Sequence, residues 1–218
     1  MLEKPSSYVE QQLERGIFIL KRGGVIAFPT DTVYGLGACS TNSQAVERIY
    51  WVKERPRSRA LPLLLTKTSQ ISEVAHPVPQ IAWQLAYRFL PGALTLVLPK
   101  RASVSDIVTA GGETVAVRVP AHPIPLALAE GLGAPIVGTS ANLSGKPPAL
   151  SADEVYSQFA TKIDLVIDGG PCSGGKESTI VDVTGQTPVI LREGAISVER
   201  IKAVCGGNVI IGIRERIA

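Results

Sequence analysis

The sequence has few aromatic residues, few cysteines and no long apolar run, and each shortage excludes a class of protein. Aromatic side chains make up 5% of the 218 residues, so the core must be mainly aliphatic. Cys39, Cys172 and Cys205 lie far apart and form no paired motif, which argues against a disulfide framework or a zinc site. No stretch approaches the ~20 apolar residues of a membrane span, and the first residues lack the apolar segment of a signal peptide. We therefore expect a cytoplasmic protein, in a reducing compartment and without a membrane partner.

Apolar residues make up 45% of the chain and its net charge is +3, values that fit a folded protein with a sizeable core. The small positive charge is compatible with an anionic ligand but does not by itself indicate a nucleic-acid partner. The length fits one large domain, with or without a short appendage.

Helical spacing and turn residues divide the sequence into alternating helices and strands, with the strands clustered late. Helices are predicted from residue 6 to the Gly23-Gly24 pair and over 41–55, 79–92, 124–133, 151–160 and 197–207. Strands are predicted over 25–30, 61–66, 93–99, 114–120, 134–140, 164–170, 178–185 and 188–194, and residues 208–218 are interpreted as a strand or a tail. This order predicts an α/β (α+β-like) fold, a twisted mixed β-sheet with flanking helices.

The stretch "PTDTVYG" places polar side chains directly after a predicted strand. Pro29 cannot donate a ladder hydrogen bond, so the strand should end there. Thr30, Asp31, Thr32 and Tyr34 then lie at the carboxyl end of a strand, where open α/β sheets bind ligands. A polar turn without a ligand is the alternative.

Basic side chains gather in the segment "KERPRSR". Lys53 and Arg55 lie at a predicted helix end, where the helix dipole favours cations. Pro56 ends the helix, so Arg55, Arg57 and Arg59 can point into a common space, and planar guanidinium groups suit phosphates. The segment is either an anion site or a solvated helix terminus.

Two further segments put polar groups where apolar ones would be expected. Arg118 interrupts the apolar strand "TVAVRVP", and a charge there must be paired or face a cavity, unless that face of the sheet is solvated. The segment "GTSANLSG" ends a strand with Thr139, Ser140 and Asn142, whose small side chains let the backbone approach a ligand closely.

Familiar catalytic motifs are scarce. His76 and His122 are the only histidines, and no metalloprotease, serine-hydrolase or EF-hand motif occurs. The segment "GPCSGGKES" has P-loop spacing but carries Glu177 where the motif needs Ser or Thr, and a strand is predicted to follow instead of a helix. We therefore expect no P-loop, no metal-binding residues and, in an enzyme, catalysis by positioning and electrostatics. Ser178 and Arg192, at strand ends, are further candidate ligand contacts.

Taken together, these segments resemble the YrdC-type threonylcarbamoyl-AMP synthase family. The resemblance covers roughly residues 16–194 and rests on "PTDTVYGLG", "KERP", "LPGALTLVLP", "VAVRVP", "GTSANLSG", "STIVDV" and "LREG". Each segment is weak evidence alone, but their common order and spacing are specific to the family.

The resemblance implies an α/β fold with a large, positively lined cavity. It implies an L-threonylcarbamoyladenylate synthase, a nucleotidyltransferase that condenses L-threonine, bicarbonate and ATP, with Mg²⁺, to threonylcarbamoyl-AMP and pyrophosphate. No tightly bound prosthetic group is expected. In the family, downstream threonylcarbamoyl transferase proteins then modify adenosine 37 of tRNAs that read codons starting with A.

The resemblance also implies a role for individual residues. Lys53 and Arg55 would be catalytic, and the nucleotide contacts would be Lys53, Arg55, Arg59, Ser140, Asn142 and Arg192. The threonine contacts would be Thr30, Thr32, Arg118, Thr139 and Ser178.

One position departs from the family pattern. Many members have a histidine near the threonine where an ungapped comparison places Leu64, which leaves the details of threonine recognition open. The family also has a long form with an extra C-terminal domain. The sequence predicts one YrdC-like domain over 1–218, with a core at about 16–194 and a short C-terminal helix and tail over 195–218. Two other functions stay open: a module that binds tRNA or double-stranded RNA, and a paralogue that handles another carbamoyl-adenylate.

Overall fold

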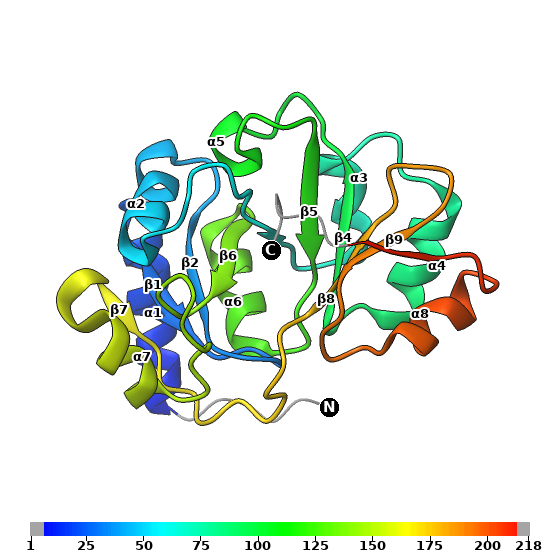
Figure 1. Ribbon diagram of the computed structural model, residues 1–218. Helices are drawn as coiled ribbons and strands as arrows, with labels where there is room; N and C mark the ends of the chain where they lie inside the picture. Colours follow the sequence, from blue (N-terminus) through cyan, green and yellow to red (C-terminus); the bar gives the residue numbers. More distant parts are fainter. Residues whose placement is uncertain (1–6, 213–218) are drawn as a thin grey trace.

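A twisted sheet of ten strands lies at the centre of residues 7–212, the part of the chain that this computed structural model describes (Figure 1). Its order is β10-β9-β8-β4-β5-β3-β6-β2-β1-β7. Parallel pairs (β1/β7, β3/β5, β4/β8, β9/β10) occur among antiparallel ones, so the predicted mixed sheet is confirmed. The strands are β1 (Ile26–Phe28), β2 (Gly35–Cys39), β3 (Leu63–Leu64), β4 (Leu94–Pro99), β5 (Thr114–Arg118), β6 (Ile136–Ser140), β7 (Leu165–Val166), β8 (Thr179–Asp182), β9 (Val189–Arg192) and β10 (Ile210–Ile211).

Helices cover the faces and the ends of this sheet. Figure 1 shows α4 and α8 beside β9, at one end of the sheet, and α2 and α7 at the other end, near β1. The helices are α1 (Ser7–Lys21), α2 (Ser43–Lys53), α3 (Ile71–Val74), α4 (Gln80–Phe89), α5 (Asp106–Thr109), α6 (Pro123–Leu132), α7 (Ala152–Phe159) and α8 (Val198–Val204), with 3₁₀ turns η1 (Thr68–Gln70) and η2 (Ala160–Lys162).

Alternation along the central strands sends side chains to two different environments. Leu96 of β4 and Val117 of β5 are register partners and belong to the large core on one face of the sheet. Val97 and Ala116, also partners, belong to a small apolar cluster on the opposite face. This period of two is the pattern expected of strands buried on both sides.

The opposite face is divided into two apolar regions. Leu64, Ile136 and Leu128 form part of a cluster beneath α1 and α6, and these two helices pack against each other. Ile180 belongs to the small cluster next to β4 and β5. A cavity lies between the two regions, since Leu64 and Ile180 both line it.

Most predicted helices and strands are confirmed, although with shorter bounds. The first helix ends before Gly23-Gly24, as predicted, and Asn42 caps α2 by accepting a hydrogen bond from Ala45 N at 3.0 Å. Strand β8 follows the glycine-rich segment at residues 170–178, which confirms that this segment is not a P-loop.

The strand predictions were wrong in detail at three places. The strand predicted over 164–170 is reduced to Leu165–Val166. Strand β2 was missed because its glycines, Gly35 and Gly37, are poor strand formers and the segment was interpreted as a turn. The strand predicted over 61–66 is reduced to Leu63–Leu64. The segment 208–218 forms β10 at Ile210–Ile211, and residues 213–218 lie outside the described residues. Across residues 7–212, no helix combines the length and the apolar character that crossing a bilayer requires.

Candidate functional site: a basic cavity on one face of the sheet

The turn that follows β1 is held by its own hydroxyl groups. Thr30 Oγ1 donates to Val33 O at 2.6 Å and accepts from the backbone N–H of Thr32 at 3.1 Å. The backbone hydrogen bonds of β1 stop at Pro29, and these side-chain hydrogen bonds hold the chain in place after that point. The turn therefore fixes Asp31 and Thr32 beside the end of β5.

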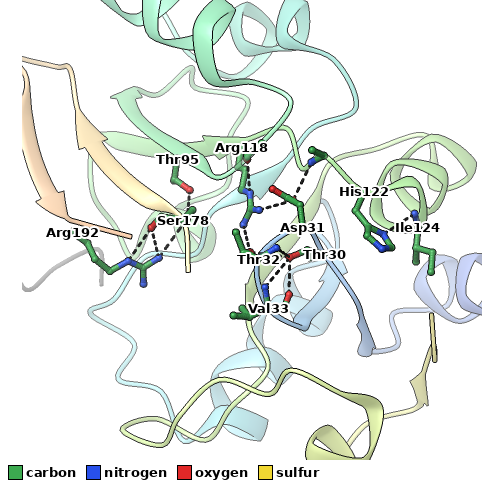
Figure 2. Close-up of polar contacts among 12 residues, drawn as sticks. Thr30, Asp31, Thr32, Val33, Thr95, Arg118, His122, Ile124, Ser178 and Arg192 are labelled. Atoms are coloured by element: carbon green, nitrogen blue, oxygen red, sulfur yellow. Dashed lines mark hydrogen bonds and ion pairs between the residues drawn. The ribbon is translucent and has the colours of Figure 1, made fainter. Parts of the chain in front are cut away.

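Arg118 emerges from the end of β5 and is bonded on three sides (Figure 2). Its guanidinium donates to Asp31 Oδ1 at 2.7 Å, to Thr32 Oγ1 at 3.0 Å and to Gly92 O at 3.0 Å. The residue is 8% exposed, so burial lowers the pKa of Arg118, whereas the Asp31 carboxylate opposes that shift. The prediction that this charge is paired or faces a cavity is confirmed on both counts.

Lys53 is the last residue of α2, and it is almost completely buried at 2% exposed. Its ammonium donates to the main-chain oxygens of Ser140 and Asn142, the second at 2.7 Å, and to Asn142 Oδ1 at 3.3 Å. Burial, aided by the nearby charge of Arg55, lowers the pKa of Lys53 from 10.5 to about 7. A cation held in this way, by neutral oxygens alone, is suited to an incoming anion.

Glu54 ends α2 in a left-handed backbone conformation, and Arg55 follows it. The side chain of Arg55 folds back over the loop at residues 56–60. It donates to Ala60 O at 2.9 Å and to Arg59 O at 3.3 Å. Within residues 7–212, neither Lys53 nor Arg55 forms an ion pair. Two cations without a carboxylate partner therefore lie together.

Arg57 does not join them, which corrects the expectation that Arg55, Arg57 and Arg59 share one space. Arg57 is highly exposed and pairs with Glu47 on the preceding helix. Arg55 and Arg59 line the cavity, whereas Arg57 does not. A turn explains the difference: the backbone N–H of Arg59 donates to Pro56 O at 3.1 Å, so the chain reverses at Arg57 and does not continue as an extended segment.

The end of β6 and the turn after it form a second wall of the cavity, which Lys53 at the end of α2 contacts directly. Ser140 Oγ donates to Asn142 Oδ1 at 2.6 Å, and Asn142 Nδ2 donates to Lys146 O at 2.8 Å and Leu143 O at 3.0 Å. The amide of Asn142 thus ties the turn together and orients the oxygens that hold Lys53. The small side chains of "GTSANLSG" leave room for a ligand above this wall.

The third side of the cavity comes from β8 and β9. Arg192 pairs with Glu177 at 2.9 Å and donates to Ser178 O at 3.0 Å, while Ser178 Oγ and Thr95 Oγ1 are 2.8 Å apart (Figure 2). Gly194 is required here, because a Cβ at that position would overlap the main chain of Glu177 and Ser178. The glycine of "LREG" therefore lets the two strands close around Arg192.

These three sides enclose one cavity of about 290 Å³. All the predicted site residues line it: Thr30, Thr32, Lys53, Arg55, Arg59, Arg118, Thr139, Ser140, Asn142, Ser178 and Arg192. The basic residues among them face a single acidic lining residue, Glu177, so the cavity favours anions. The structure brings the predicted residues together, and their roles toward ligands remain predictions.

The sequence analysis gave no role to three further residues of the site. Asp31 holds Arg118, Glu177 holds Arg192, and Thr95 meets Ser178. Thr95 could have been found as a polar residue on the cavity face of an apolar strand. Asp31 was among the polar residues expected after the first strand, but the pairing of either carboxylate could not be predicted, because the partner arginines lie on other strands. Leu64, at the position where the family often has histidine, also lines the cavity.

Fold and site together define an α/β protein with a basic cavity suited to an anionic ligand. The chain belongs to the Sua5/YciO/YrdC family: the family model described as "Telomere recombination" matches residues 18–194. It is 45% identical over 198 residues to a threonylcarbamoyl-AMP synthase of Bacillus subtilis (strain 168), a match that covers 90% of this chain and 57% of that protein.

Two solved structures have the same fold. Sua5 of Pyrococcus abyssi, described as complexed with L-threonine, superposes with a TM-score of 0.89 at 44% identity, over 92% of this chain and 59% of that one. E. coli YciO superposes with a TM-score of 0.82 at 31% identity, over 91% of this chain and 95% of that one. The chain thus spans little more than half the length of the B. subtilis and P. abyssi proteins.

Proposed function

We propose that the protein is an L-threonylcarbamoyladenylate synthase, which condenses L-threonine, bicarbonate and ATP to threonylcarbamoyl-AMP and pyrophosphate. One observation carries the proposal: the buried Lys53 and the half-buried Arg55, which form no ion pair within residues 7–212, share a cavity with the Arg118–Thr32 pair. The similarity to proteins named threonylcarbamoyl-AMP synthase, and to a Sua5 described as complexed with L-threonine, supports it.

Threonine would bind at the end of the cavity formed by Arg118. A guanidinium has five N–H donors, and the contacts to Asp31, Thr32 and Gly92 use three, so two remain for a carboxylate. The hydroxyls of Thr30, Thr32, Thr139 and Ser178 surround this position and can bond the amine and the hydroxyl of the substrate.

ATP would bind at the other end, with its phosphates on Lys53, Arg55, Arg59 and Arg192, beside Ser140 and Asn142. Mg²⁺ would enter as part of the substrate, bound to the triphosphate. The residues fit this arrangement because Glu177, the one acidic residue in the lining, is already paired with Arg192.

The reaction needs charge compensation more than it needs a base. The threonine amine and bicarbonate form a carbamate with loss of water. A carbamate oxygen then bonds to the α-phosphorus of ATP, and the bond from that phosphorus to the bridging oxygen breaks to release pyrophosphate. The nucleophile is already anionic, so the barrier is the repulsion between carbamate and triphosphate, which Lys53 and Arg55 offset. The cavity also holds the two reactants in contact.

The position of the cations favours a small anion over an RNA duplex. Lys53 and Arg118 are buried at 2% and 8% exposure, so a duplex backbone cannot reach them. We propose that tRNA enters later, through transferase proteins that use the threonylcarbamoyl group. The cytoplasm is the compartment we propose for this chemistry, and the unpaired state of Cys39, Cys172 and Cys205 is compatible with it.

Mass spectrometry of the product tests the proposal. The protein is incubated with ATP, Mg²⁺ and ¹³C-bicarbonate, together with threonine, serine or no amino acid. We expect a ¹³C-labelled threonylcarbamoyl-AMP, with pyrophosphate in equal amount, in the threonine reaction. Pyrophosphate release that does not depend on an amino acid, or labelled product only with another amino acid, would contradict it.

A further inference from the structure

A second, smaller cavity of about 190 Å³ lies next to the basic cavity. Leu65, Ala129, Ala134 and Pro135 contribute apolar surface to its lining, and Thr66, Gln70 and Glu130 contribute polar groups. Within the described residues, Leu64 is the one residue that lines both cavities. This side chain therefore separates the two spaces.

The pairing of β3 explains the position of Leu64. In the parallel pair with β5, Leu64 is the register partner of Arg118, so both side chains project from the same face of the sheet. On the other side β6 provides Gly138, where a Cβ would lie 2.5 Å from Leu64 Cδ1. Leu64 thus lies flat over Gly138, directly beside Arg118, and is 6% exposed.

We propose that Leu64 is the partition that limits the size of the amino-acid side chain the enzyme accepts. This inference rests on the proposed function, in which Arg118 binds the carboxylate of the amino acid. A substrate anchored on Arg118 has its side chain within reach of Leu64, the neighbour of Arg118 in the sheet. A short side chain such as that of threonine fits in front of Leu64, and a longer one meets it.

Shortening Leu64 joins the second cavity to the first. The added space borders the apolar side chains of Leu65, Ala129 and Pro135, so it can take a longer aliphatic side chain such as that of isoleucine. The chemistry is unchanged: the carbamate of the new amino acid attacks the α-phosphorus, and pyrophosphate leaves.

The test compares kcat/KM for threonine and isoleucine, from pyrophosphate release, in the wild-type chain and in Leu64→Ala. We expect the isoleucine-to-threonine ratio to rise by about tenfold or more, since one or two methylenes in an apolar pocket are worth roughly 10–200-fold. Leu64→Val, a milder change that preserves more of the packing, should give a smaller rise in the same direction.

Ala134→Phe is the matched control, because Ala134 lines the second cavity and not the first. Alone it should leave the ratio unchanged, and combined with Leu64→Ala it should cancel the gain by filling the added space. Wild-type activity with an unchanged ratio in Leu64→Ala and Leu64→Val overturns the partition alone. No threonine-dependent pyrophosphate release from the wild-type chain overturns the proposed function, and the partition with it.

Discussion

The ammonium of Lys53 donates to the main-chain carbonyl of Asn142 at 2.7 Å, across 89 positions of sequence. The same ammonium also bonds the carbonyl of Ser140 and the side-chain oxygen of Asn142. Lys53 therefore joins the end of α2 to the turn that carries Ser140 and Asn142. We expect Asn142 to act largely through Lys53, because its own side-chain oxygen and nitrogen are already bonded.

Arg55→Ala should lower the rate of threonine-dependent pyrophosphate release on the order of 10²–10³-fold, by analogy with other electrostatic sites. The charge it removes faces the cavity and has no carboxylate partner within residues 7–212. Circular dichroism should show an intact fold. The control is Arg57→Ala, an exposed arginine four positions after Lys53, which should keep near-normal activity. A folded Arg55→Ala with the wild-type rate would exclude the role.

Asp31→Ala should lower the free energy of unfolding by about 3–5 kcal/mol, because it leaves the buried guanidinium of Arg118 without its carboxylate. The double variant Asp31→Ala/Arg118→Met should lose less than the sum of the single changes. Urea unfolding measures all three. Lys162→Ala breaks the exposed pair with Glu54 and serves as control, with an expected cost of at most about 1 kcal/mol. Strict additivity would show that Asp31 and Arg118 do not act together.

The stability of the ligand-free protein should rise with pH above about pH 7. Below pH 7 Lys53 is protonated in the folded and unfolded chains, so the cost of burying its charge is fully present. Between about 7 and 10.5 the unfolded chain binds this proton and the folded chain does not. The free energy of unfolding therefore gains up to about 1.4 kcal/mol per pH unit from this group. Lys53→Met should flatten the plot of unfolding free energy against pH between about pH 6 and pH 9. Parallel plots for the wild-type protein and the variant would refute the assignment of this pH dependence to Lys53.

ATP binding at about pH 8 should take up a proton. The triphosphate favours the ammonium form of Lys53, so it raises the pKa that burial had lowered. Isothermal titration calorimetry in two buffers with different protonation enthalpies should give different observed heats. In Lys53→Met the difference should largely vanish, and equal heats for the wild-type protein would count against the mechanism.

The main elements of the fold follow from local patterns, and the exceptions have physical causes. Apolar alternation predicted β4 and β5, and glycine or asparagine marked the helix ends. Strand β2 was missed because it is held by its neighbours β1 and β6, and not by the strand preference of its glycine-rich sequence.

The membership of the site could be predicted from the sequence, but its internal pairing could not. Arg118 stood out as a charge in an apolar strand, yet the carboxylate that pairs with it, on Asp31, lies 87 positions away in the sequence. Arg57 looked equivalent to Arg55 in sequence, and only the packed structure shows that Glu47 draws it to the surface. Such long-range pairings depend on the order of strands in the sheet, which local spacing does not encode.

The closure of β8 and β9 around Arg192 has a consequence for synthesis on the ribosome. Arg192 joins the cavity through hydrogen bonds to Ser178, so the basic cavity of the nascent polypeptide is incomplete until β9 has been made and paired. Under the proposed function, ATP would bind only the finished sheet and would shift the folding equilibrium toward it by mass action.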